Sequence, residues 1–261
     1  MQVALAPYWR PEYAKDISGL LPAIRQYFEE IKEFIRNPEN EEIVRSFIDS
    51  HRNRFVTEEN RYDVFPAQDV ANMEFRRLNI ATAVNFAFGN DLERADTTIE
   101  LNPALAMTLL GVIGEGIIEN TESYRSTEAA PVGFPIPYYL GSESIQESIE
   151  QLFRDFNRPI EPNRGDWYVL ATKFFRRFLY IHPFQDGNGR VSRILLSILL
   201  MNYTVVPLCP FTWKRNSNEE FLRSLDEAHM YDNEELLRCF IIEAVHNNLE
   251  VCRQYFGLDA V

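Results

Sequence analysis

Apolar residues recur every three to four positions along most of this chain, and this spacing is the strongest constraint on its fold. In the clearest case, residues 166–181, the large apolar side chains fall on one side of a helix, at Trp167, Leu170, Phe174, Phe178 and Ile181. A stripe of this kind must be buried against neighbouring helices. The sequence therefore predicts an all-α protein.

The same spacing predicts the positions of the other helices. Proline, asparagine and glycine between the apolar stretches mark the helix ends. We expect helices at residues 17–35, 41–51, 72–88, 103–118, 144–156, 166–181, 189–202, 219–229 and 233–255. Residues 53–68, which are polar and contain Pro66, are predicted to be a connecting segment.

Residues 119–141 depart from the helical pattern. Pro131, Pro135 and Pro137 lie there among alternating apolar and aromatic residues. Because proline has no N–H to give to a sheet, this alternation favours a short exposed β-hairpin or an extended loop over a central strand. We therefore expect one irregular insert in an otherwise helical bundle.

Length and element order predict the division of the chain. A chain of 261 residues can form one substantial domain with an extension. We expect an N-terminal helical extension at residues 1–95, a catalytic core at 96–210, and C-terminal helices packed on that core at 211–261. Residues 1–95 contain no motif that indicates their role.

Composition argues against several partners and compartments. The 39 acidic and 26 basic residues give a net charge of −13, which repels nucleic-acid backbones. The sequence has no apolar run of 18 residues, so we expect no membrane-spanning helix. Three cysteines are too few for a disulfide framework and favour reduced thiols, so we expect a cytoplasmic protein. The oligomeric state is left open.

The segment from residue 181 to residue 193, Ile-His-Pro-Phe-Gln-Asp-Gly-Asn-Gly-Arg-Val-Ser-Arg, carries the most chemistry. Pro183 favours the end of one helix at His182, and the glycines favour the start of the next near residue 188. The first N–H groups of a helix lack internal partners and carry the positive end of its dipole. This turn is therefore a candidate anion site.

The charged residues of the turn fit a nucleotide. Arg190 and Arg193 lie three apart, on one side of the new helix, and arginine suits phosphate oxygens. Asp186 would repel phosphates unless a divalent cation, most often Mg²⁺, lies between them. His182 can take a proton from a hydroxyl near neutral pH.

Each of these features has an ordinary structural explanation when taken alone. A single histidine at a helix end is more often a cap, Asp-Gly-Asn-Gly is more often a turn, and paired arginines more often face solvent. Phe184 is expected to anchor the loop in the core. Only the combination at this spacing favours a functional site.

The segment resembles the signature of the Fic family, His-x-Phe-x-Asp/Glu-Gly-Asn-Gly-Arg-x-x-Arg, and all eight specified positions match. The resemblance implies a Fic-type helical bundle with a short β-hairpin flap before the motif. It also implies a protein adenylyltransferase, which transfers AMP from ATP to a Tyr, Thr or Ser hydroxyl of a target protein. In that reaction His182 would be the general base, and Asp186 would hold Mg²⁺.

The resemblance also assigns the nucleotide-binding residues. Gly187, Asn188 and Gly189 would surround the phosphates, with Arg190 on the β-phosphate and Arg193 nearer the γ-phosphate. ATP would thus be the substrate and Mg²⁺ the cofactor.

Residues 123–139 resemble the family's flap, a hairpin that holds a target backbone by adding a strand. On this basis Gly133, Phe134 and Ile136 are candidate target-binding residues. Glu122 departs from the pattern, because relatives usually have glycine there.

Many relatives carry an inhibitory helix with the pattern Ser/Thr-x-x-x-Glu-Gly/Asn. Residues 97–101 match it only in part, and Phe86 stands four residues after Thr82, where the glutamate would be. We therefore expect either a separate inhibitory partner or no such brake.

Two other kinds of function stay open at this stage. A related enzyme could transfer UMP, phosphocholine or phosphate, or could remove AMP. Gly189 argues against phosphate transfer, because the relatives that carry it out typically have lysine there. The chain could also be a catalytically idle interaction module, although an intact motif argues against this.

Overall fold

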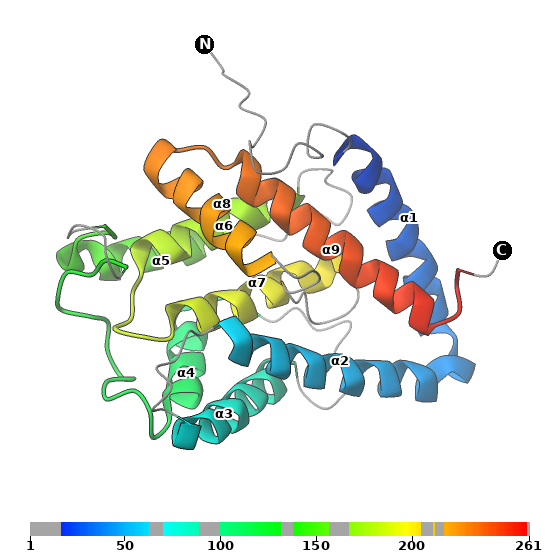
Figure 1. The fold of residues 1–261 in the computed structure, drawn as a ribbon, viewed down its shortest axis with the longest axis horizontal. Coiled ribbons are helices and arrows are strands. Elements are labelled where there is room, and N and C mark those ends of the chain that lie inside the picture. Colours follow the sequence, from blue (N-terminus) through cyan, green and yellow to red (C-terminus); the bar gives the residue numbers. More distant parts are fainter. Residues whose placement is uncertain are drawn as a thin grey trace, which may run out of the picture. The chain divides into compact units, whose positions relative to one another are not determined.

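The computed structural model describes residues 17–62, 70–88, 100–131, 138–156, 167–204, 211 and 217–259, and within these ranges it is helical without any strand (Figure 1). The helices are α1 Ile17–Arg36, α2 Glu41–Tyr62, α3 Val70–Phe88, α4 Pro103–Gly114, α5 Ile145–Phe156, α6 Trp167–Ile181, α7 Asn188–Thr204, α8 Ser217–Tyr231 and α9 Glu235–Tyr255, with 3-10 turns η2 Pro38–Asn40 and η4 Ser142–Ser144. The all-α prediction is confirmed. None of the described helices combines the length and apolar character needed to cross a bilayer.

Two helix ends differ from the prediction by more than two residues. Helix α2 continues to Tyr62, because Phe47, His51 and Phe55 form a buried stripe that carries it past residue 51. Helix α4 ends at Gly114, four residues early. A Cβ atom at Gly114 would lie 2.6 Å from the Thr121 side chain, so the chain folds back closely at this point.

The predicted β-hairpin is not seen. Described residues 115–131 and 138–141, on both sides of its expected tip, contain no strand. The N–H groups of Tyr138 and Tyr139 both donate to the single carbonyl of Ala129, at 3.3 and 3.4 Å, so no ladder of separate pairs forms here. The prolines of the insert remove further donors. The tentative flap residues Gly133, Phe134 and Ile136 lie outside the described residues.

Contacts between residues divide the chain into two compact units. One unit joins the two ends of the chain, Met1–Phe47 and Cys209–Val261, and the other is the continuous segment Ile48–Leu208. The three-part division expected from the sequence, at residues 1–95, 96–210 and 211–261, stays a prediction.

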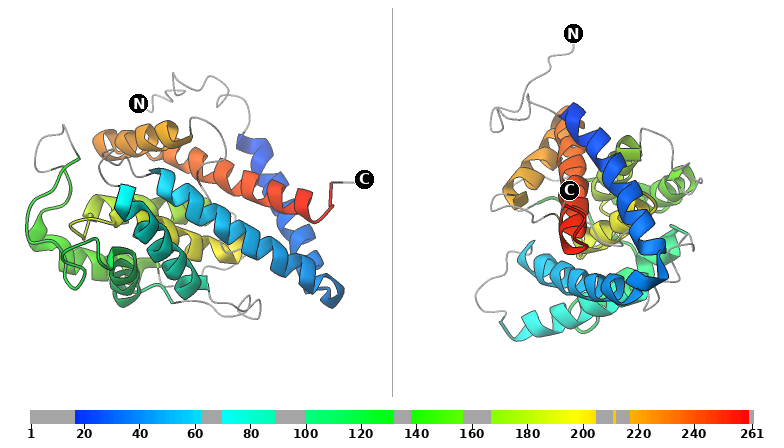
Figure 2. Two further views of the ribbon diagram at one scale, coloured as in Figure 1. Left: turned by 60° about the horizontal axis from the view of Figure 1, so that its bottom comes forward. Right: turned by 90° about the vertical axis from the view of Figure 1, so that its right-hand side faces the viewer.

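The unit formed by the chain ends is built around α9. Helices α1 and α8 both pack on it, and Figure 2 shows α8 and α9 side by side. Arg253 on α9 bonds Glu30 of α1 at 2.7 Å and lies over the Tyr27 ring. Cys239 and Cys252 are both buried on α9, and burial raises the pKa of the Cys252 thiol.

The continuous unit is built around α7. Helices α3, α4 and α6 pack against it, and α5 packs against α6. Every residue from Val191 to Leu200 is buried, and all are apolar except Arg193 and two serines, Ser192 and Ser197, which donate back to carbonyls of α7. This packing fixes where the first turn of α7, and therefore the motif, must lie.

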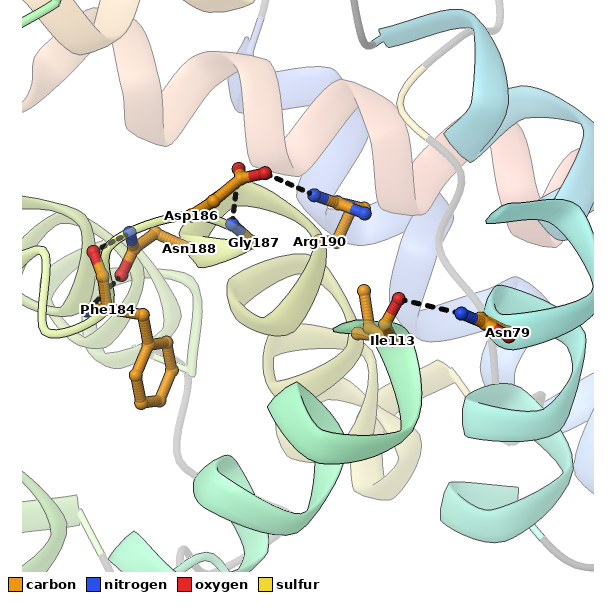
Figure 3. Close-up of polar contacts among 7 residues, drawn as sticks. All are labelled: Asn79, Ile113, Phe184, Asp186, Gly187, Asn188 and Arg190. Carbon is orange, nitrogen blue, oxygen red and sulfur yellow. Dashed lines mark hydrogen bonds and ion pairs between the residues drawn. The ribbon is translucent and has the colours of Figure 1, made fainter. Parts of the chain in front are cut away.

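Asn79 joins α3 to the end of α4. Its buried side-chain amide donates to the Ile113 carbonyl at 3.2 Å (Figure 3) and to the Glu115 carbonyl at 2.8 Å. The last carbonyls of a helix have no partner within that helix. One side chain from α3 therefore closes the end of α4, next to the turn at Gly114.

We expect Asn79→Ala to lower the free energy of unfolding by about 1–3 kcal/mol, because it leaves buried carbonyls without a donor. Urea unfolding of the full chain measures this change. Asn85→Ala is the matched control, since Asn85 is an exposed asparagine on the same helix and should change stability by no more than about 0.5 kcal/mol. Equal effects of the two substitutions would show that the Asn79 bonds do not stabilise the fold.

Candidate active site

The motif turn begins at His182, directly after the last residue of α6. The His182 N–H makes the last helical bond, to the Phe178 carbonyl at 3.0 Å. The backbone of His182 then takes a φ of 48°, in the left-handed region that costs a non-glycine residue free energy. The histidine therefore occupies a strained position that other contacts must hold.

Asn188 closes the turn from the other side. Its side-chain amide donates to the Phe184 carbonyl at 2.7 Å, and its side-chain oxygen accepts from the Phe184 N–H at 2.9 Å (Figure 3). The Phe184 ring is fully buried, near the rings of Tyr124 and Phe178. The side-chain amide of Asn188 is thus engaged by the turn, and its backbone N–H lies at the start of α7.

Gly187 is required by both conformation and space. Its φ is 82°, and a Cβ atom there would lie 3.0 Å from Cδ1 of the fully buried Leu110. The Gly187 carbonyl accepts from Val191 at 2.9 Å, which is the first internal bond of α7. The N–H groups of residues 188–190 precede that bond, so they form the positive end of the helix dipole.

Two arginines lie at this helix start. Arg190 and Arg193 are both buried, 3% and 5% exposed, which is unusual for arginine unless it is paired. The Arg193 guanidinium lies against Gly189, and a Cβ atom at that position would be 3.1 Å from its Nη1. Any larger residue at 189 would displace Arg193.

Asp186 faces the same helix start. Its carboxylate accepts from the Gly187 N–H at 2.5 Å and pairs with Arg190 at 3.2 Å. The Asp186 side chain remains 60% exposed, whereas that of Arg190 is 4% exposed. In Figure 3 this carboxylate and the Phe184 ring point to opposite sides of the turn, so the anchor faces the core and the carboxylate faces outward.

The His182 ring is stacked on a tyrosine from the insert. The rings of His182 and Tyr139 lie 3.8 Å apart, with 6° between their planes. The imidazole is only partly buried.

Arg125, also from the insert, bonds the backbone on both sides of the histidine. Its Nε donates to the His182 carbonyl at 2.7 Å, and its Nη2 donates to the Ile181 carbonyl at 3.3 Å. The other donors of the guanidinium reach the carbonyls of Thr127, at 2.6 Å, and Leu140. The Arg125 N–H also donates to the Pro183 carbonyl at 2.9 Å.

Two further contacts hold the base of the insert. Glu128 accepts from the backbone N–H and the hydroxyl of Ser142, at 3.0 and 3.1 Å, and these bonds lower the pKa of its carboxyl group. The Leu140 N–H donates to the Tyr180 carbonyl at 3.1 Å, which attaches the insert to the end of α6.

The structure thus brings His182, Asp186, Arg190 and Arg193 to one turn, as the motif predicted. Sequence reasoning assigned no role to Arg125, Tyr139 or Asn79. The sequence held one signal for Arg125: it is a charged residue in an apolar, proline-rich insert, and a guanidinium is buried in such surroundings only when it is paired. The described residues contain no group of three or more His, Cys, Asp or Glu side chains placed to hold a metal ion.

Comparison with known proteins gives the family. The profile of the Fic/DOC family matches residues 114–200, which include the insert, α5, α6, the turn and most of α7. A Fido domain-containing protein of Dictyostelium discoideum is 30% identical over 117 residues, which are 45% of this chain and 78% of that protein. The chain belongs to the Fic/DOC family. This family match covers every residue of the motif turn.

Other relatives extend the likeness less closely. A protein of Nematostella vectensis named protein adenylyltransferase Fic is 23% identical over 186 residues, and the match covers 53% of this chain and 42% of that one. The solved structure of a Fic-1 fragment from C. elegans has the same fold, with a TM-score of 0.65, 15% identity and coverage of 92% of this chain and 72% of that one. The Fic-type helical fold is thus confirmed, while this chain spans less than half of the named adenylyltransferase.

We expect Gly187→Ala to destabilise the chain more than Gly116→Ala. Both glycines have positive φ, so each substitution costs about 1–2 kcal/mol of backbone strain. Only Gly187 would also place its new methyl group against Leu110, since nothing lies within 4 Å of the Gly116 position. Urea unfolding of both variants measures the difference. Equal losses would mean that the contact with Leu110 relaxes without cost.

Proposed function

We propose that this chain is a protein adenylyltransferase, which transfers AMP from ATP to a Tyr, Thr or Ser hydroxyl of a protein target. The observation that carries this proposal is the start of α7, where two buried guanidinium groups, an exposed carboxylate and a partly exposed imidazole meet in one turn. Relatives named protein adenylyltransferase Fic support the choice of reaction.

The start of α7 fits the phosphates of a nucleotide. The N–H groups of residues 188–190 and the helix dipole favour an anion at this place. Arg190 and Arg193 add two charged forks that match phosphate oxygens. In our proposal Arg190 exchanges its contact with Asp186 for the β-phosphate, and Arg193 lies nearer the γ-phosphate.

Asp186 fits the role of a Mg²⁺ ligand. Mg²⁺ at nucleotide sites is typically held by one or two carboxylates together with substrate phosphates, so a single carboxylate suffices here. The Asp186 side chain is exposed at the mouth of the phosphate site, as this role requires. The bound ion would neutralise phosphate charge and orient the phosphates.

His182 would act as the general base. The target hydroxyl gives its proton to the imidazole while its oxygen bonds to the α-phosphorus of ATP. The bond from that phosphorus to the bridging oxygen breaks, and pyrophosphate leaves with the electron pair. The products are an AMP-modified protein and pyrophosphate, and the proton on His182 passes to solvent.

The first test is transfer itself. We expect the full chain, given labelled ATP alone or with a cell lysate, to produce protein that carries the mass of one AMP group. Parallel reactions with GTP, UTP and CTP identify the transferred nucleotide. His182→Ala should lower transfer by at least about 100-fold while ATP still binds. Gln185→Ala, at an exposed position of the same turn, is the control and should keep full activity.

Other results would contradict this assignment. A UMP or phosphocholine adduct, or release of AMP from a modified target, would replace the proposed reaction by another of this family. Nucleotide binding without any turnover, unchanged by His182→Ala, would favour an interaction module.

Asp186→Ala should remove transfer and its dependence on Mg²⁺ together. Asp186→Asn keeps an oxygen for the Gly187 N–H but loses the charge, so it separates the metal role from the turn geometry. We expect both variants to be inactive, and only Asp186→Ala to lose stability in urea unfolding. Transfer at full rate without divalent metal would refute the role of this carboxylate.

A further inference from the structure

We propose that Arg125 and Tyr139 position the His182 imidazole for proton transfer. This inference rests on the proposed function, in which His182 is the general base. Neither residue would touch the nucleotide. Arg125 acts on the backbone of the histidine, and Tyr139 acts on its ring.

Arg125 holds the backbone of His182 in its left-handed conformation. A φ of 48° is disfavoured for histidine, so the two carbonyls around it need fixed partners. The Arg125 guanidinium supplies both, at 2.7 Å to His182 and 3.3 Å to Ile181. It is 4% exposed, so water cannot replace these bonds without opening the turn.

The shape of the arginine side chain is part of the argument. Guanidinium presents five N–H donors in a rigid plane, and here these donors reach four carbonyls in three segments, at Thr127, Leu140, Ile181 and His182. Lysine carries its three donors on a single nitrogen at the end of a flexible side chain, so it cannot reach the same four carbonyls. An arginine at position 125 is therefore required to bond the base of the insert and the end of α6 with one side chain.

Tyr139 fixes the rotation of the His182 ring. Bonds to the backbone do not restrict the side-chain torsions of His182, whereas a parallel ring at 3.8 Å does. The backbone at Tyr139 is held in turn, because its N–H bonds Ala129 and the next carbonyl, of Leu140, accepts from Arg125. Both restraints on the histidine therefore depend on the same guanidinium.

The phosphate site is held by other contacts. Asn188 closes the turn on Phe184, and Gly187 starts α7, without any bond to Arg125 or Tyr139 in the described chain. Loss of the two positioning residues should therefore lower kcat and leave the KM for ATP nearly unchanged. A residue that only stabilised the fold would not produce this separation.

Side-chain NMR of the four histidines tests the geometry without any turnover. A ring stacked on an aromatic face has its proton signals shifted upfield, and His182→Gln identifies which signals belong to His182. Tyr139→Phe should leave these signals in place, because it keeps the ring, and Tyr139→Leu should move them downfield. Unchanged signals in Tyr139→Leu would overturn the proposed stacking.

Kinetics then tests the effect on transfer. We expect Tyr139→Leu to lower kcat by about 10- to 100-fold with the KM for ATP within about twofold, and Tyr139→Phe to restore kcat. Tyr180→Leu, which removes an exposed ring two residues before the histidine, is the matched control and should have no effect. An unchanged kcat in Tyr139→Leu, or an equal rise in KM, would overturn the positioning role.

Arg125→Lys and Arg125→Gln complete the test. Both substitutions should move the His182 signals and lower kcat. The kcat of Arg125→Lys should be no higher than that of Arg125→Gln, because a positive charge alone is not sufficient. Full activity of Arg125→Lys would contradict the requirement for a planar fork. If wild-type protein transfers nothing, the proposed function fails, while the NMR comparison still decides whether Tyr139 and Arg125 hold the histidine.

Discussion

The end of α6 is closed by one buried arginine, and the backbone conformation of His182, where the motif turn begins, depends on that contact. A helix leaves its last carbonyls without internal donors, and a buried end must obtain them elsewhere. Arg125 supplies donors to Ile181 and His182 through its side chain, and to Pro183 through its backbone N–H. The chain can therefore turn sharply at a strained histidine and begin α7 six residues later.

The second consequence is electrostatic. The chain as a whole is strongly acidic, with a net charge of −13, yet the start of α7 gathers two buried guanidinium groups, the positive end of the helix dipole and the Asp186 carboxylate. Burial of arginine is costly, and placing two at a helix N-terminus is unfavourable for the dipole. Under the proposed function, the phosphates of a nucleotide would contribute to offsetting both costs. The net negative charge of the chain is the reason why we propose a free nucleotide, and not a nucleic acid, as the source of that anion.

What the sequence could predict follows from how local each feature is. Every predicted helix has a counterpart in the described chain, because apolar spacing is read within one helix. The motif turn was predictable too, since residues 182–193 are contiguous and proline and glycine mark its ends. Arg125 contacts His182 across 57 residues, and Asn79 contacts Ile113 across 34, so no local pattern reveals which partners they bond. The hairpin failed for a related reason: alternation suggested strands, but paired strands need donors that prolines lack.

The contribution of α3 shows how support for the site extends beyond the family match, which begins at residue 114. Asn79 closes the end of α4, and the chain turns directly afterwards at Gly114. Ile118 follows in that turn, and its side chain lies 3.4 Å from the position of a Cβ atom on Gly187. Gly187, the residue before α7, is thus packed against a turn whose carbonyls accept hydrogen bonds from Asn79 of α3. Because cores are close-packed, a shift of α3 must be taken up along this path, so the helix before the family match helps to fix the start of α7, where we propose that phosphates bind.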